Sequence, residues 1–185
     1  MIALLDPTHK LSIVNLHSGE GWEAMFNPTE LPETVRANYS DQQITGLSFV
    51  PRQYTNTTNH SFSLSLFMVA STENEALILD EPEDGINSPS RDISSMRGIT
   101  NFLYSFLYPV QETSAAGGGP PLALVVWPNH LTMRCTIESV SPKTLQFASN
   151  GTPIRTMVEV EFQEYRATPL TSEEVRLHGV KRNYT

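Results

Sequence analysis

The strongest pattern in the chain is an alternation of apolar and polar residues between His130 and Tyr165. In the first half of this stretch the apolar side chains fall on odd-numbered positions, and in the second half mostly on even-numbered ones. These apolar residues are Leu131, Met133, Cys135, Ile137, Leu145 and Phe147, followed by Ile154, Val158, Val160 and Phe162. A period of two is typical of a strand with one buried face, so the stretch predicts two half-buried strands.

Asn150 and Gly151 lie between these strands and predict a tight hairpin turn. Both residues tolerate the positive φ of a type I′ turn. A two-residue loop at this position would place Phe147 opposite Ile154, and Ser139 opposite Phe162. The apolar positions of the two strands then share one face without a bulge, so turn chemistry and hydrophobic pattern predict one register.

The second face of this hairpin is polar, so we expect it to meet water or a polar partner. Pro142 and Pro153 cannot donate to the ladder, and we expect them to bend the ribbon or to place it at a sheet edge. The polar residues on this face are Glu138, Gln146, Arg155, Glu159, Glu161 and Gln163.

Shorter segments repeat the alternation, and one segment has a helical period instead. Strands are predicted over Lys10–Leu16, Trp22–Phe26, Glu33–Tyr39, His60–Ala70 and Leu122–Trp127, the last of them buried on both faces. An irregular connection is expected at 42–53, a long acidic loop at 71–91, and one helix at about 92–108. The prediction is a mainly β domain at 1–166, which contains the acidic loop, followed by a C-terminal polar arm at 167–185.

Composition and charge narrow the classes of function. The chain has 185 residues, 39% of them hydrophobic, and a net charge of −8. This length suits one domain, and the negative charge opposes binding to nucleic acids. The sequence contains no run of about 20 apolar residues and no signal-peptide pattern. We therefore expect an intracellular, soluble protein that binds neither nucleic acid nor membrane.

Motifs for catalysis or metal binding are not evident. Cys135 is the single cysteine and lies on an apolar strand face, so a core thiol is expected and no internal disulfide can form. The histidines lack zinc-ligand spacing. An EF-hand alignment of the acidic loop places Pro82 and Arg91 where oxygen ligands are required. We therefore predict no metal, no cofactor and no enzymatic activity.

Two groups of residues leave other functions open. Glu159 and Glu161 share a strand face, as an acid–base pair would, although a solvated or interface face is the commoner role of such carboxylates. Aromatic residues could form a platform for a sugar or peptide, although core or subunit packing is the commoner role. These aromatic residues are Trp22, Trp127, Tyr54 and Tyr165.

The order of several segments resembles the tube-type domain of contractile injection systems, as found in the baseplate tube-initiator or spike–tube adaptor proteins of phage-tail-like particles. The matching segments are Met25-Phe26-Asn27-Pro28-Thr29-Glu30, Phe62–Phe67, the helix after the acidic insertion, Pro121–Trp127, Thr136–Val140, Asn150–Arg155 and Val158–Tyr165. The resemblance covers residues 10 to 166. Members often carry a C-terminal LysM module, which we do not expect here because the sequence ends at Thr185. The acidic stretch 71–91 is also longer and more acidic than the resemblance implies.

The resemblance implies a fold and a mode of assembly. The implied fold is two antiparallel sheets packed as a sandwich or small barrel, with one flanking helix. The implied assembly is a hexameric ring whose sheets join into the lining of a channel, with the polar face of the central hairpin toward the lumen. The candidate fold and assembly residues are Phe26, Asn27, Pro28, Asn150, Gly151, Arg155, Glu159, Glu161 and Gln163.

The resemblance also implies a function. We expect a structural ring that connects the spike to the inner tube and initiates tube assembly, made in the bacterial cytoplasm and then built into the particle. Expected partners are a neighbouring tube-like ring or inner tube protein, the spike or hub protein, and baseplate wedge proteins. The alternatives are a bulk inner-tube subunit and a non-catalytic ligand-binding β-sandwich.

Overall fold

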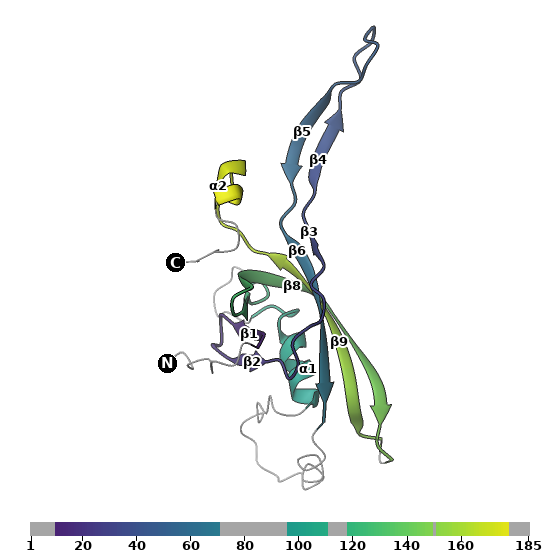
Figure 1. Ribbon diagram of the computed structural model, residues 1–185, viewed down its shortest axis with the longest axis vertical. Helices are drawn as coiled ribbons and strands as arrows, with labels where there is room; N and C mark the ends of the chain where they lie inside the picture. The colour runs from purple at the N-terminus through teal and green to yellow at the C-terminus, as the bar shows by residue number, and fades with distance from the viewer. Residues whose placement is uncertain (1–9, 71–95, 111–117, 150, 178–185) are drawn as a thin grey trace.

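The computed structural model describes residues 10–70, 96–110, 118–149 and 151–177, and shows a bent sheet from which a long hairpin projects (Figure 1). All strand pairings are antiparallel, so the predicted mainly β fold with two antiparallel sheets is confirmed. The elements in chain order are β1 (Ser12–Asn15), β2 (Gly21–Glu23), β3 (Glu33–Thr34), β4 (Ala37–Asp41), β5 (Arg52–Thr57), β6 (Ser61–Val69), α1 (Met96–Ser105), β7 (Ala123–Trp127), β8 (Leu131–Phe147), β9 (Pro153–Glu164) and α2 (Ser172–Leu177).

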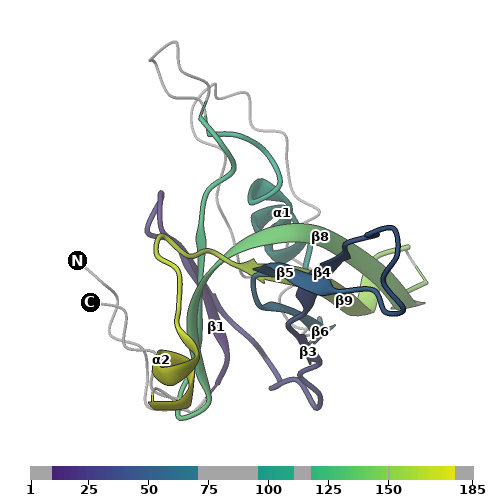
Figure 2. The same ribbon diagram turned by 90° about the horizontal axis from the view of Figure 1, so that it is seen from above.

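The larger sheet has seven strands in the order β2-β1-β7-β8-β9-β6-β3. Its centre is the ribbon of β8 and β9, and β6 pairs with β9 from Ser61 to Val69. Figure 2 shows β8 curving past α1, which contacts both β8 and β9. The strands of the described residues form no closed barrel. The second sheet contains only β4 and β5, which form the projecting hairpin.

The core lies between the bent sheet and α1. Even-numbered positions of β6 and β9 point inward, as their period of two predicts. The rings of Phe62 and Phe162 stack with their centroids 4.9 Å apart. Burying one such side chain stabilises the fold by about 1.5–3 kcal/mol. Buried residues of these elements include Phe62, Leu64, Leu66 and Met68, then Val158, Val160 and Phe162, and Met96, Ile99, Phe102 and Leu103 from α1.

The predicted strands are found as β1, β6, β7, β8 and β9, whereas the strand predicted over Trp22–Phe26 ends at Glu23 and other details need correction. The single strand predicted at 33–39 is two strands, β3 and β4. β5 was not predicted, because all six of its residues are exposed and no apolar alternation marks it. The prediction that 122–127 is buried on both faces is wrong, since Leu124 and Val126 of β7 are only half-buried.

The predicted helix is found, and it ends at Ser105, three residues before the predicted end. α1 lies within the predicted range 92–108, whereas the acidic stretch 71–91 and residues 92–95 lie outside the described residues. The predicted polar arm contains α2, which begins with a capping box: the N–H of Thr171 donates to the Glu174 carboxylate at 2.8 Å, and the N–H of Glu174 donates to Thr171 Oγ1 at 3.3 Å.

Candidate assembly surfaces

The turn between β8 and β9 is a three-residue loop, not the predicted two-residue type I′ turn. The N–H of Ala148 donates to the carbonyl of Thr152 at 2.7 Å, and the N–H of Gly151 donates to the carbonyl of Ala148 at 3.0 Å. Gly151 has a φ of +86°. A type I turn followed by a glycine with positive φ is the usual three-residue hairpin connection. Asn150 lies outside the described residues.

The longer loop shifts most of the ribbon by one residue from the predicted register, with irregularities on either side of the Gln146–Arg155 pair, which keeps that register. Phe147 pairs with Pro153 instead of Ile154, and Ser139 pairs with Glu161 instead of Phe162. A bulge between Ile137 and Ser139 lets Ile137 pair with Phe162, so the core face is restored toward the start of β8. Leu145 and Phe147, which were expected to be buried, are 49% and 60% exposed because the ribbon continues beyond the core at this end.

The face of β6, β9 and β8 that points away from the core is mostly polar; we call it the outer face. Glu161 pairs with Ser63 on one side and Ser139 on the other, and Ser139 Oγ donates to the Glu161 carboxylate at 2.8 Å. Glu159 lies in the same way between Ser65 and Ser141. Arg155 is exposed and Gln163 is half-buried at the two ends of the same strand.

Two long strand edges of the larger sheet have no partner strand among the described residues. β7 pairs with β8 only up to Cys135, so the rest of β8 pairs with β9 alone. Pro142 lies in this part of β8, which has a neighbouring strand on one side only. A proline, which has no backbone N–H, is tolerated at such an edge position. β3 pairs only with Ser61 and Phe62, which leaves the rest of β6 with β9 alone. Open edges of this kind are templates for strands of another chain.

The projecting hairpin has no core of its own. Every residue of β4 and β5 is exposed. The Tyr39 and Tyr54 rings meet edge to face at 5.9 Å, and Arg52 lies over Tyr39, 5.1 Å from its centroid. The cross-strand polar contacts are Asn38–Asn56 at 3.0 Å, Gln42–Gln53 at 3.1 Å and Asp41–Arg52 at 3.2 Å. Exposed contacts contribute little stability, at most about 1 kcal/mol each.

The loop that joins β4 to β5, residues 42–51, is uncharged and carries four large apolar side chains; we call it the tip. Its large side chains are exposed, from 46% for Leu47 to 64% for Phe49, with Ile44 and Val50 between these values. Exposed apolar residues gathered in this way are typical of an interaction surface. The sequence prediction missed this surface. The available signal was a run from Gln42 to Pro51 with several large apolar residues and no charge.

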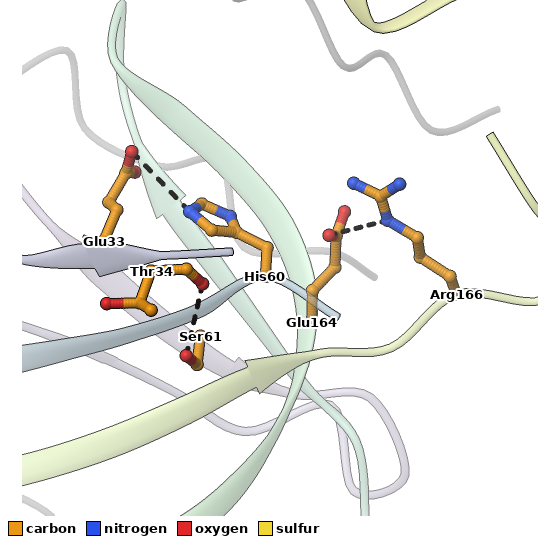
Figure 3. A network of polar contacts seen from close by, with 6 residues as sticks. All are labelled: Glu33, Thr34, His60, Ser61, Glu164 and Arg166. Atoms are coloured by element: carbon orange, nitrogen blue, oxygen red, sulfur yellow. Dashed lines mark hydrogen bonds and ion pairs between the residues drawn. The ribbon is translucent and has the colours of Figure 1, made fainter. Parts of the chain in front are cut away.

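A polar network fixes the base of the projecting hairpin (Figure 3). The His60 imidazole lies 3.6 Å from the Glu33 carboxylate, and Ser61 Oγ donates to the carbonyl of Thr34 at 3.3 Å. On the other side of His60 the Glu164 side chain, only 1% exposed, lies 2.6 Å from Arg166 Nε. A buried carboxylate needs such a partner because burial of an unpaired charge is costly. The N–H of Glu164 donates to the carbonyl of His60 at 2.7 Å, which ties the hairpin base to the end of β9.

The Phe26-Asn27-Pro28 motif divides into structural and exposed residues. The N–H of Leu11 donates to Asn27 Oδ1 at 3.0 Å, and Pro28 is buried. Phe26 is 54% exposed, and its ring lies 5.8 Å from that of Phe67. Asn27 and Pro28 therefore hold the chain in place after β2, whereas Phe26 faces outward.

The described residues include one buried thiol and several of the aromatic side chains considered above. No group of three or more metal-ligating side chains occurs among them. Burial, together with the negative charge of Glu164, raises the pKa of the Cys135 thiol, so this cysteine stays protonated at neutral pH. Trp22 is buried in the core and Tyr54 lies on the projecting hairpin, so the aromatic platform is not assembled. The described helices are too short to cross a membrane.

Open strand edges are places where strands of another chain can pair, and here they occur together with a polar outer face and a projecting hairpin. The chain belongs to the family of contractile injection system tube proteins, which matches residues 8–173. It is therefore a structural tube protein of a phage-tail-like particle.

Among solved structures, the chain is similar to one described as "Tail of empty GTA particle computed with helical refinement, C6 symmetry", with 13% sequence identity and a TM-score of 0.39. The match covers 91% of this chain and 100% of that chain. The search of curated proteins finds no match.

Proposed function

We propose that this chain forms a closed hexameric ring that connects the spike to the inner tube of the particle and initiates tube assembly. The ring is supported by two strand segments that each have one open edge: β8 after Cys135 and β6 after Phe62. These two segments lie on opposite sides of β9. Pairing of β8 of one copy with β6 of the next satisfies both edges, and a closed ring leaves no edge free.

The outer face supports a channel lining. Glu159 and Glu161, which are flanked by serines, make this face hydrophilic, as the wall of a water-filled channel requires. The opposite face of the same strands covers the core. The wall in this proposal is passive: it carries no catalytic group, and its partners are the spike or hub protein, the first tube ring and the wedge proteins. Assembly takes place in the bacterial cytoplasm, before the ring becomes part of the particle.

The bulk inner-tube subunit is a second candidate, and one observation favours it. A subunit that stacks on copies of itself needs complementary surfaces at its two ends. Apolar side chains are exposed at the tip of the hairpin and again at Phe26, on the other side of the hairpin base. The proposal of a ring at the spike is supported by the resemblance of the motifs around Phe26 and Gly151. The proposal of a subunit repeated along the tube is supported by these exposed surfaces.

A reconstruction of the assembled particle, combined with counting of copies by quantitative mass spectrometry, tests both candidates. One hexameric layer between spike and tube, six copies per particle, is the expected result. Copies repeated along the tube would favour the bulk subunit. A three-fold spike layer, or a position among the wedge proteins outside the tube, would contradict the ring. Deletion of the gene should leave no tube or sheath of defined length.

A further inference from the structure

The outer face changes character at the end of the ribbon that lies away from the projecting hairpin (Figure 1). The outward positions of β6 are serines up to Ser65, and the next one is Phe67, which pairs with Met157 of β9. The ring of Phe26, 54% exposed, lies 5.8 Å from that of Phe67. We call Phe26, Phe67 and Met157 the apolar patch. It interrupts a face that is mostly polar.

Two exposed cations border the apolar patch. Lys143 lies opposite Met157 on β8, and Arg155 lies two positions from Met157 along β9, on the same face. The carboxylates of the outer face, Glu159 and Glu161, lie further towards the hairpin base. A surface that covers this patch should therefore be apolar, with negative charge at its margins.

The segment 71–95 joins β6 to α1 and lies outside the described residues, but the chain is described at both of its ends. Before the segment, the N–H of Ala70 donates to the carbonyl of Ile154 at 2.8 Å. After the segment, Thr156 Oγ1 donates to the sulfur of Met96 at 2.9 Å. Both ends are therefore held on β9, beside the cationic border of the apolar patch.

The sequence of this segment is complementary to the apolar patch. It contains seven of the 20 acidic residues of the chain and one of its 12 basic residues, so it carries −6 of the net charge of −8. Its only run of apolar residues is 76–79, which lies between Glu75 and Asp80; we call residues 76–79 the apolar run. An apolar run between carboxylates matches an apolar surface between cations in both respects.

We propose that the apolar run docks on the apolar patch of the same copy, with its flanking carboxylates beside Lys143 and Arg155. The length of the chain permits this contact. Leu77 follows Ala70 by seven residues and can lie up to about 23 Å from it, whereas Phe67 is about 10 Å from Ala70 along β6. The contact needs neither a ring nor a second layer of rings.

In the hexameric ring of the proposed function, which this part of the inference presupposes, the docked segment changes the channel wall. It covers the apolar and cationic end of the outer face and places its own carboxylates there. The acidic character that Glu159 and Glu161 give to the wall then extends to the end of the ribbon. Phe26 is covered as well and is not available to a further ring, in agreement with a single hexameric layer.

Disulfide formation in the purified full-length protein tests the contact. The variant carries Leu77→Cys in the apolar run and Met157→Cys in the patch, while the native Cys135 is buried. The control combines Met157→Cys with Ser88→Cys, because Ser88 is eight residues from Met96 and so has a similar reach. The intramolecular disulfide should form about tenfold faster in the variant than in the control, as for a docked state favoured by about 1.4 kcal/mol.

The charges at the border of the patch are tested in the same assay. Arg155→Glu should slow formation of the Leu77–Met157 disulfide by about threefold, and the effect should shrink at high salt. Arg97→Glu makes the same change of charge at an exposed residue next to the other end of the segment, and should leave the rate unchanged. Equal rates in these two charge variants would remove the cations from the contact.

Equal rates in the Leu77 and Ser88 variants would overturn the contact, and so would disulfides that form mainly between copies. A second measurement leaves the body of the protein unaltered. Ile78→Ser, in the apolar run, should speed cleavage after Glu75 by a glutamate-specific protease by about tenfold. The control Ile86→Ser, in the same segment, should not change it, and equal cleavage in the two variants would refute the docking. Because both assays use isolated protein, they can fail while rings still form in particles, so they are separate from the test of the proposed function.

Discussion

The β6–β9 pair and the projecting hairpin are both antiparallel, but different forces hold them. In β6 from Phe62 to Met68, and in β9 from Thr156 to Glu164, every second side chain is buried, at 0–4% exposure. In β4 and β5 every side chain is exposed, and the contacts are polar pairs and the Tyr39–Tyr54 edge. The first pair is stabilised mainly by burial of apolar surface, and the second mainly by its attachment to the sheet.

This difference separates what a residue does for folding from what it does for assembly. A two-stranded hairpin alone is marginally stable in water, because it has no face to bury. The projecting hairpin therefore costs backbone entropy that its own contacts barely offset. Its exposed apolar tip gains stabilisation only when it contacts another subunit. Substitutions in the two regions should affect different measurements.

The largest expected effect is on the core between the seven-stranded sheet and α1, which together we call the body. Phe162→Ala removes a ring that is 1% exposed and stacked on Phe62, and should lower the free energy of unfolding by about 3–5 kcal/mol. The matched change in the tip, Phe49→Ala, should alter it by less than about 0.5 kcal/mol. Urea unfolding followed by far-UV circular dichroism measures both. Similar losses in the two variants would break the comparison.

The sequence predicts the body well for the same physical reason. Alternation marks a strand with one buried face, so β1, β6, β8 and β9 were found. The sequence pattern does not predict β5, because both of its faces are exposed to solvent and its residues show no alternation of apolar and polar side chains. The register of β8 and β9 was wrong because Asn150-Gly151 suits both a two-residue and a three-residue loop. The bulge after Ile137 brings Ile137 opposite Phe162, so the apolar pattern is compatible with both loop lengths.

The assembly surfaces were harder to predict than the fold. Phe26 was found only through the resemblance of its motif, and its exposure was not foreseen. For the tip the sequence predicts only an irregular connection, because apolar side chains in a sequence indicate burial without indicating which surface buries them. Glu159 and Glu161 were placed on a polar face by parity alone. Whether that face lines a channel is a question about neighbouring copies.

Two glycines with positive φ provide the next comparison. Gly151→Val adds a Cβ that meets nothing within 4 Å, so its cost is backbone strain at φ +86°. We expect a loss of about 1–2 kcal/mol in the free energy of unfolding. Gly151→Asn, which tolerates this conformation better, should recover most of it. Gly46→Val introduces the same strain at φ +95° in the tip and should leave the unfolding of the body unchanged. Equal losses at both glycines would show that the tip unfolds with the body.

Alkaline pH should weaken the body through Cys135. Burial and the charge of Glu164 raise the thiol pKa in the folded state, so above about pH 9 the thiol ionises only in the unfolded chain. The stabilisation is fully present below that pH and is lost as the pH rises, by about 1.4 kcal/mol per pH unit. Wild type should therefore lose about 1 kcal/mol more than Cys135→Ala between pH 9 and pH 10, because the thiol of the unfolded chain is already half ionised at the start of this interval. Parallel pH profiles of the two proteins would argue against this ionisation.

The smallest expected effect on stability comes from the largest change in sequence. Replacing Ala37–Thr57 by Asn-Gly joins Arg36 to Thr58, which already lie side by side, since the N–H of Thr58 donates to the carbonyl of Arg36 at 2.8 Å. The free energy of unfolding should change by less than about 0.5 kcal/mol, because the excised residues bury no core and the network around His60 remains.

A control keeps β4 and β5 and replaces Ile44, Leu47, Phe49 and Val50 by serine. Both proteins should unfold like wild type and fail to build particles, because both lack the apolar tip. A loss above about 2 kcal/mol in the shortened protein alone would show that the strands of the hairpin support the body. Particles formed by the serine variant but not by the shortened protein would move the assembly contact from the tip to the strands, where Tyr39 and Tyr54 offer the next exposed surface.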